Sequence, residues 1–274
     1  MNKKVTIGEV VEYLDKKFQP KLQEDYDNAG FLLGDSSMSY TGALVALDLT
    51  AAVAEEAVKE GLNLIVTHHP FIFSGLKRIT DHTEAGRITL KLIKNNISVY
   101  AAHTNLDNLP WGVNGILAEK LGLRNCRILK GVQGSARECE GVQDNSIGAG
   151  MVGELTRKVE ADKFLMQVKK ALGQPTIRTS AHDPKQGIKR VAICGGSGAE
   201  FIPDAIAAGA DLYLTADLKY HDFQRAEKGI ILADAGHYET EQFAKEIISR
   251  IISEKFCNFA CRISESQASL IQYI

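Results

Sequence analysis

The stretch "ALVALDLTAAVAEEAVKEGLNLIVTHHP", residues 43–70, has the pattern of a strand, a helix and a second strand. An apolar run comes first, an Ala/Glu-rich segment follows, and Gly61 ends the predicted helix before a second apolar run. Because a strand, a helix and a strand of these lengths form a βαβ unit, the stretch predicts two parallel strands in one sheet. The second strand continues into two adjacent histidines, His68 and His69.

The segments on either side of this stretch extend the same pattern. Thr6 and Glu9 have the spacing of a capping box, which predicts a helix from residue 7 onward. "EDYDNAGFLLGD", residues 24–35, is rich in turn residues and is interpreted as a loop. Residues 83–96 are predicted to form a helix, and "ISVYAAHTNLDN", residues 97–108, a strand that continues into a loop. A largely parallel sheet is therefore expected.

An internal repeat is the strongest sign of how the chain is organised. "RVAICGGSGAEFIPDAIAAGADLYLTADLKYH", residues 190–221, repeats the order strand, small-residue turn, helix and apolar strand. Downstream of the two copies, His103 lies four residues before Asp107 and His237 lies four residues before Glu241. Any two βαβ units resemble each other, but a repeated histidine and acid at matching places favours a true duplication.

The expected fold class is α/β, with two similar βαβ-based lobes, mixed and mostly parallel sheets, and a metal site between the lobes. The first lobe is predicted at residues 1–125, a polar, glycine-rich linker or loop region at 126–150, and the second lobe at 151–274, together forming one compact unit. Within the second lobe, "MVGEL" at 151–155 predicts a strand and residues 160–173 an amphipathic helix.

Composition excludes several classes of protein. The net charge of −2 argues against a nucleic-acid protein that binds through a basic surface. The N-terminus has no apolar signal segment, and no apolar run approaches the roughly 20 residues of a membrane span. A cytoplasmic location without membrane contact is expected. The cysteines, odd in number and scattered, are then interpreted as reduced thiols: Cys126, Cys139, Cys194, Cys257 and Cys261.

Candidate metal ligands follow the predicted strands, where ligands collect in open α/β sheets. They are His68, His69, His103, Asp107, His237 and Glu241. Imidazole and carboxylate bind zinc, iron and manganese. The alternatives are a plain strand end for the paired histidines and an orienting role for His103. Because neighbours on a strand point to opposite faces, His68 and His69 are expected to diverge and to suit two ions, or one ion and a contact that supports a ligand, better than a single chelate. His82 and His182, in polar turns, are not expected to be ligands.

Two further segments are candidates for substrate contact. "CGGSG", residues 194–198, lies between a strand and a helix, so Gly195, Gly196, Ser197 and Gly198 are possible anion contacts through their amides. The alternative is a tight turn that needs positive φ. "TADLKYH" places Lys219, Tyr220 and His221 where a phosphate or a leaving group needs donors, or else in an ordinary polar loop.

Six motifs together resemble a known family: "DNAGFLLGD", "THHPFIF", "AAHTNLDN", "CGGSG", "TADLKYHDF" and "DAGHYETE". The family is that of the GTP cyclohydrolase 1 type 2 homologues, also called Nif-three-like proteins, and the resemblance covers essentially the whole chain in order. Longer members carry an inserted domain, and this chain resembles the short form. The resemblance implies a homohexameric toroid, with two divalent transition-metal ions in each subunit.

Carried over by motif, the metal ligands are His68, His69, Asp107, His237 and Glu241, with Glu241 bridging the ions and His103 close by. The ions would be zinc, iron or manganese. The leading hypothesis is a metal-dependent hydrolase of a nucleotide or of another phosphorylated or heterocyclic small molecule, either GTP cyclohydrolase-like or a phosphoesterase. His103 or His221 would move the proton.

The alternative is a non-catalytic metal carrier, storage or regulatory ring protein, so enzymatic activity is left open. A ring that engages DNA is a third possibility, against which the net charge argues. The expected partners are other copies of the chain and a small-molecule substrate.

Overall fold

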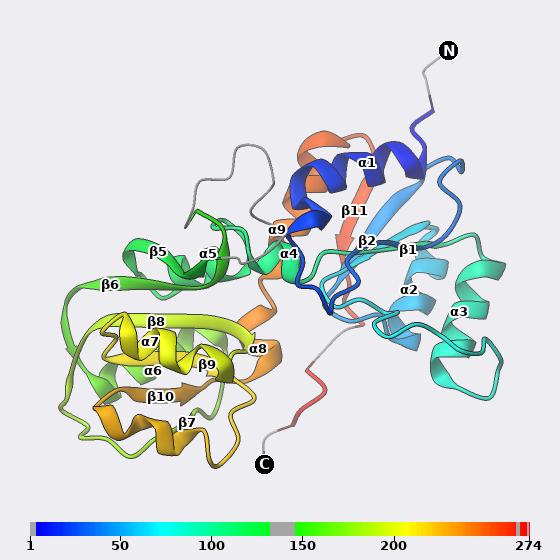
Figure 1. The fold of residues 1–274 in the computed structure, drawn as a ribbon. Helices are drawn as coiled ribbons and strands as arrows, with labels where there is room; N and C mark the ends of the chain where they lie inside the picture. The colour runs from blue at the N-terminus through cyan, green and yellow to red at the C-terminus, as the bar shows by residue number, and fades with distance from the viewer. Residues whose placement is uncertain (1–3, 132–145, 267–268, 273) are drawn as a thin grey trace. The chain divides into compact units, whose positions relative to one another are not determined.

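The structure is a computed structural model that describes residues 4–131, 146–266, 269–272 and 274. Its contacts divide the chain into two compact units (Figure 1). The first contains the residues up to Leu106 and the segment that begins again at Ala244, and the second contains Asp107–Phe243 and the residues from Ser269 onward. The lobe boundaries expected from the sequence, with a division near residues 126–150, stay a prediction.

The first unit is built on a five-stranded sheet in the order β1-β4-β3-β2-β11. Its strands are β1 (Gly30–Leu33), β2 (Gly42–Ala46), β3 (Leu64–Thr67), β4 (Ser98–Ala101) and β11 (Ala260–Ile263). All neighbours are parallel except β1, which pairs antiparallel with β4. In Figure 1 the red strand β11, from the far end of the sequence, lies beside the blue strand β2.

Local sequence explains where the helices of this unit begin and end. They are α1 (Ile7–Phe18), η1 (Pro20–Leu22), α2 (Ala51–Glu60), α3 (Glu84–Lys94), α4 (Thr104–Asp107, whose last residue begins the second unit) and α9 (Ala244–Lys255). The capping box of Thr6 and Glu9 is present at α1. Gly61 ends α2 at φ +68°, a conformation that suits glycine.

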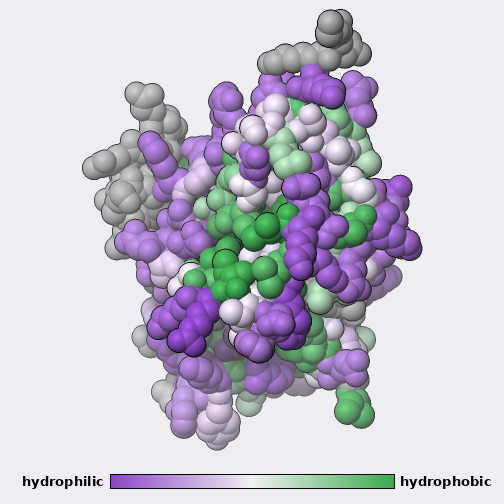
Figure 2. Space-filling view, turned by 90° about the vertical axis from the view of Figure 1, so that its right-hand side faces the viewer, coloured by the Kyte–Doolittle hydropathy of each residue, from purple (hydrophilic) through white to green (hydrophobic). Residues whose placement is uncertain are grey.

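The core of the first unit lies between its sheet and helices α2 and α3. Residues of β2, β3 and β4 pack there against Val53, Ala57, Ile88 and Leu92 of the two helices. Each fully buried aliphatic side chain contributes about 1.5–3 kcal/mol to the free energy of folding. Figure 2 views the first unit from the side of α2 and α3 and shows hydrophobic residues gathered among polar ones.

The prediction of a loop over residues 24–35 is wrong at its centre. Residues 30–33 form β1, and Phe31 and Leu33 pair with Tyr100 and Val99 of β4. The strand was hidden because it has only four residues and is partly buried, so no long alternation marks it in the sequence.

The second unit is built on a six-stranded sheet in the order β5-β6-β8-β9-β10-β7. Its strands are β5 (Arg124–Gly131), β6 (Gly148–Glu160), β7 (Arg178–Thr179), β8 (Gly187–Ser197), β9 (Leu212–Ala216) and β10 (Ile231–Asp234). Strands β8, β9 and β10 are parallel, and the other neighbours are antiparallel. The predicted linker therefore begins and ends in strand, and residues 132–145 lie outside the described residues.

Helices of the second unit contribute to two hydrophobic clusters. They are α5 (Val113–Lys120), α6 (Ala161–Leu172), η3 (Ala199–Phe201), α7 (Ile202–Ala207), η4 (Phe223–Lys228) and α8 (His237–Glu241). Phe164 and Val168 of α6 belong to one cluster, and Ile202 and Ala205 of α7 to the other. In the part of the chain that the structure describes, no helix is long and apolar enough to cross a membrane.

The predicted duplication is confirmed by the strand orders. The first sheet contains the series β1-β4-β3-β2 and the second the series β7-β10-β9-β8. In each series one antiparallel strand is followed by three parallel strands in reverse chain order. The α/β fold class with two similar lobes is therefore correct, and the carboxyl end of each parallel set is where functional side chains are expected.

Candidate metal centre

His68 is the first residue after β3 and is fully buried. Its Nδ1 lies 2.7 Å from the carbonyl oxygen of Ala102, just after β4. A carbonyl oxygen only accepts, so Nδ1 must carry the proton and donate it. The neutral ring then has its lone pair on Nε2, which is the form in which histidine binds metal.

His69 does not diverge from His68 as the strand pattern predicts. Strand β3 ends at Thr67, whose hydroxyl donates to the carbonyl oxygen of His69 over 2.7 Å, so the alternation of side chains stops there. The two imidazole rings are 5.1 Å apart between centroids. The Nδ1 of His69 lies 2.7 Å from a carboxylate oxygen of Asp48, which follows β2.

His103 completes a histidine cluster in the first unit. Its Nδ1 lies 2.8 Å from Asp27, whose side chain is fully buried. Burial alone would raise the pKa of Asp27, but hydrogen bonds from His103 and Thr104 and the charge of His103 lower it to about 2. One ligand nitrogen from each of His68, His69 and His103 lies within 4.8 Å of the other two. The structure thus brings these three predicted residues together.

In the second unit, His237 and Glu241 lie on one face of the short helix α8. His237 Nε2 and Glu241 Oε2 are 2.9 Å apart, as the spacing of four residues predicts. His237 Nδ1 lies 2.7 Å from Asp217, which follows β9 at φ +57°. Helix α8 ends at Glu241, and the next helix, α9, begins at Ala244.

The glycine turn at the end of β8 receives the carboxylate of Glu241. Gly196 has φ +63°, and a Cβ atom at this position would collide with that carboxylate. The amide of Gly196 donates to Thr240 Oγ1 over 3.0 Å, and the amide of Gly195 donates to Asn114 Oδ1 over 2.9 Å. These two amides therefore already serve protein acceptors. Anion contacts at Gly195, Gly196, Ser197 and Gly198 stay a prediction.

Asp107 is a second acid near Glu241 in the second unit. Burial raises the pKa of the Cys194 thiol, and the nearby carboxylates of Asp107 and Glu241 raise it further. The backbone carbonyl of Asp107 accepts a hydrogen bond from Asn114 over 3.2 Å. Asp107, His237 and Glu241 thus gather where β8 ends and α8 begins.

Comparison with known proteins agrees with these motifs. The family Duf34/NIF3, NGG1p interacting factor 3, matches residues 5–269. The chain belongs to this family. A Clostridium perfringens (strain 13 / Type A) relative named GTP cyclohydrolase 1 type 2 homolog is 36% identical over 238 residues, which cover 86% of each chain. A Lactococcus lactis relative of the same name is 32% identical over 264 residues, which cover 94% of each chain.

Solved structures have the same fold. A Staphylococcus aureus hypothetical protein aligns over 99% of this chain and 100% of its own, with a TM-score of 0.88 and 30% identity. A Bacillus cereus protein related to NIF3 aligns over the full length of both chains with a TM-score of 0.88 at 24% identity, which supports the fold alone. The family resemblance noted in the sequence is confirmed.

Sequence reasoning missed three carboxylates that hold the NIF3 histidines in place. They are Asp27, Asp48 and Asp217, each 2.7–2.8 Å from the Nδ1 of a histidine. Asp48 and Asp217 follow the carboxyl ends of β2 and β9, so their position after a buried strand was an available signal. Asp27 follows no strand, and only the tertiary fold reveals its role.

The remaining predicted residues lie elsewhere. Lys219, Tyr220 and His221 are exposed, and the ring of His221 lies 5.2 Å from that of Tyr220. Their roles in catalysis or substrate binding stay predictions. The His82 side chain is 88% exposed, and His182 bonds to Asp162 and Ser180. Of the five cysteines, the four that the structure describes are free thiols, and Cys139 lies outside the described residues.

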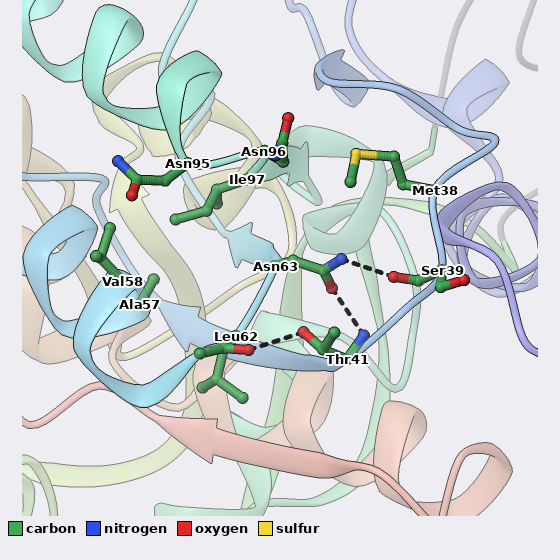
Figure 3. Close-up of a pocket in the computed structure, with 11 residues that line it drawn as sticks. Met38, Ser39, Thr41, Ala57, Val58, Leu62, Asn63, Asn95, Asn96 and Ile97 are labelled. Carbon is green, nitrogen blue, oxygen red and sulfur yellow. Dashed lines mark hydrogen bonds between the residues drawn. The ribbon is translucent and has the colours of Figure 1, made fainter.

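A cavity of about 430 Å³ lies at the opposite end of the first sheet from the histidines (Figure 3). Asn63 and Ile97 come just before β3 and β4, and Val58 and Leu62 come from the end of α2 and the turn that follows it. Asn63 is held by Ser39 and Thr41, as the dashed lines in Figure 3 show. The residues that line the cavity include no acid, histidine or cysteine, so they offer binding surface but no acid–base chemistry.

Proposed function

We propose that this NIF3-family protein is a metal-dependent hydrolase that acts on a nucleotide or another phosphorylated or heterocyclic small molecule. One observation carries the proposal. Four histidines, His68, His69, His103 and His237, each place Nδ1 within 2.7–2.8 Å of a carbonyl or carboxylate oxygen. That arrangement fixes the ring and presents Nε2 to a metal, and it is the usual way in which proteins hold histidine ligands.

The proposed ligands are His68, His69, Asp107, His237 and Glu241, which would hold two divalent ions of zinc, iron or manganese. The donor types suit these metals. Helix α4 begins directly after His103 and ends at Asp107. Glu241 is 3% exposed and lies 2.9 Å from His237, and because buried carboxylates are paired or coordinate metals, it would bridge the two ions.

The chain supplies the groups for proton transfer. A divalent ion, when bound, acts as a Lewis acid and lowers the pKa of a water molecule. Asp27 remains ionised at neutral pH because its pKa is about 2, so it accepts a hydrogen bond from Nδ1–H of His103 and orients that ring. His103 can then exchange a proton at Nε2 with the substrate or the attacking water. His221 is the second candidate for this step.

The chemistry is compatible with both ring opening and phosphoester cleavage. The relatives named GTP cyclohydrolase 1 type 2 homolog favour a purine nucleotide as substrate. We also propose that the protein works as a homohexameric toroid in the cytoplasm, as its family membership suggests. A non-catalytic metal carrier with the same ligands is the alternative that the experiment below separates.

Elemental analysis followed by a hydrolysis screen tests the proposal. Wild-type protein should contain close to two transition-metal ions per chain, and Glu241→Ala should lose at least one of them. Hydrolysis of nucleotides or phosphoesters should fall by orders of magnitude in His68→Ala and in wild-type protein stripped by a chelator. His82→Ala, which changes an exposed histidine, is the matched control.

Three results would contradict parts of this proposal. Wild-type metal content in Glu241→Ala would remove the bridging role. Equal turnover by His68→Ala and the wild-type protein would separate the histidines from the reaction. Two bound ions with no hydrolysis of any compound in the screen would identify a metal carrier. Light scattering of the same preparations checks the hexamer.

A further inference from the structure

Two exposed aromatic side chains stand beside the histidine cluster of the first unit. Tyr26 is 63% exposed and Phe73 is 47% exposed. Their ring centroids are 6.4 Å apart at an interplanar angle of 52°. The Phe73 ring also meets the ring of His103 edge-on, with 6.3 Å between centroids. A continuous series of rings therefore leads from solvent to a candidate catalytic histidine.

The segment that carries Tyr26 is fixed by the same residue that orients His103. Asp27 accepts hydrogen bonds from the amide and the hydroxyl of Thr104, over 3.1 and 2.5 Å. The Thr104 hydroxyl in turn accepts from the amide of Glu24 over 2.9 Å. Tyr26 lies between these two anchored positions, Glu24 and Asp27, and Asp27 also orients His103.

The segment that carries Phe73 is tied to the same place. The side-chain amide of Asn28 donates to the carbonyl oxygen of Ile72 over 2.5 Å. Phe71, two residues before Phe73, packs against the hydrophobic core of the first unit. Phe71 is thus partly buried against the core, whereas Phe73 is exposed.

We propose that Tyr26 and Phe73 form an aromatic platform that binds the planar ring of the substrate, a nucleobase. This inference rests on the proposed function, because it assigns the substrate class of that same site. Large exposed aromatic faces next to reactive groups are typical of ligand surfaces. A ring on the platform would lie beside His103, where proton transfer is proposed. A base is favoured over an aliphatic group because a tilted pair of aromatic rings recognises a flat π system.

Binding of matched ligands with and without a base tests the platform. The probes are GTP, ATP and UTP, compared with inorganic tripolyphosphate, and dissociation constants are measured by calorimetry on the metal-loaded full chain. We expect Tyr26→Ala and Phe73→Ala each to weaken nucleotide binding about 10-fold, within the roughly 5- to 150-fold range for loss of one stacked base. The affinity for tripolyphosphate should not change.

Three further variants separate stacking from general damage. Tyr26→Phe keeps the ring and should bind nucleotides as the wild type does. Phe73→Leu keeps apolar volume without the ring and should resemble Phe73→Ala. Ile93→Ala changes another exposed apolar side chain, 51% exposed on α3, and should have no effect. Metal content should stay at the wild-type value in every variant.

The outcomes distinguish this inference from the hydrolase proposal. If nucleotides bind through the platform but are not hydrolysed, the platform stands and the hydrolase proposal fails. The platform is wrong if no nucleotide binds more tightly than tripolyphosphate, or if the alanine variants bind nucleotides as well as wild type. It is also wrong if those variants change only the oligomeric state, which would make the pair a contact between copies.

Discussion

At the scale of single residues, the hydrogen bond at Nδ1 of each histidine matters as much as the Nε2 atom that would bind metal. His68 donates to a backbone carbonyl, whereas His69 and His237 face carboxylates. These contacts select one tautomer and hold the ring before any ion arrives, so less conformational entropy is lost on binding. An imidazole without such a contact would rotate, and its affinity for metal would fall.

Asp48→Ala should therefore weaken zinc binding about 10- to 100-fold, because His69 loses the partner at Nδ1. Competition with a chromophoric chelator measures the affinity. The control is Asp81→Ala, which removes the acid beside the exposed His82, at 3.8 Å, and should leave binding unchanged. Equal losses in both variants would mean that Asp48 acts through surface charge and not through His69.

At the scale of elements, the glycine turn of β8 and the helix α8 form one fitted pair. Glu241 can approach the backbone closely because Gly196 has no side chain. Thr240, on the same helix, accepts a hydrogen bond from the amide of Gly196 over 3.0 Å and links the turn to the helix. Glycine at position 196 is therefore explained better by the space that the Glu241 carboxylate needs than by the positive φ of the turn alone.

Gly196→Ala should lower both metal content and thermal stability. Gly173→Ala is the matched control, because Gly173 has nearly the same φ, +67° against +63°, but nothing lies within 4 Å of an added Cβ atom. Both variants should lose about 1 kcal/mol from backbone strain. Only Gly196→Ala should also lose metal, as measured by elemental analysis. Equal metal content in the two variants would show that the space at Gly196 is not needed to position Glu241 for metal binding.

At the scale of the whole molecule, the chain returns to its first unit at its far end. Helix α9 and strand β11 join the sheet that begins near residue 30, and Glu56 of α2 secures the residues after β11. The Glu56 carboxylate accepts from the Ser264 hydroxyl over 2.5 Å and from the amides of Glu265 and Ser266 over 3.1 Å. These contacts close a loop of roughly two hundred residues, so their loss should lower the free energy of unfolding of the whole chain.

Stability near Glu56 should depend on pH in the acid range. Burial raises the pKa of Glu56, but the hydrogen bonds from Ser264, Glu265 and Ser266 outweigh it, so the folded-state pKa lies below the ordinary 4.5. Because the pKa is lower in the folded state, the Glu56 carboxylate stabilises the fold fully at pH values above its unfolded-state pKa. This contribution is lost as pH falls through the folded-state pKa. Glu56→Gln should cost about 1 kcal/mol at pH 7 after screening by solvent.

Urea unfolding of the two proteins between pH 3 and pH 7 measures this difference. The gap between wild type and Glu56→Gln should be widest near neutral pH and should narrow below about pH 4.5. A gap that stays constant across the range would show that the carboxylate charge contributes nothing.

The sequence by itself determined the alternation of strands and helices, the duplication and the histidine–acid pairs. These features depend on local period and spacing, which are printed in the chain: the apolar run before His68, the repeat at 190–221, and the four-residue interval from His237 to Glu241. The capping box at Thr6 is equally local. Each could be predicted without knowledge of the fold.

Only the tertiary structure decided how the histidines are held and what stands beside them. Asp27 meets His103 across 76 positions of sequence, and Tyr26 meets Phe73, 47 positions further along the chain. The end of β3 at Thr67 turned two residues expected to diverge into neighbours. Such contacts follow from how strands are ordered in a sheet and where each one stops, and no local pattern encodes either of these.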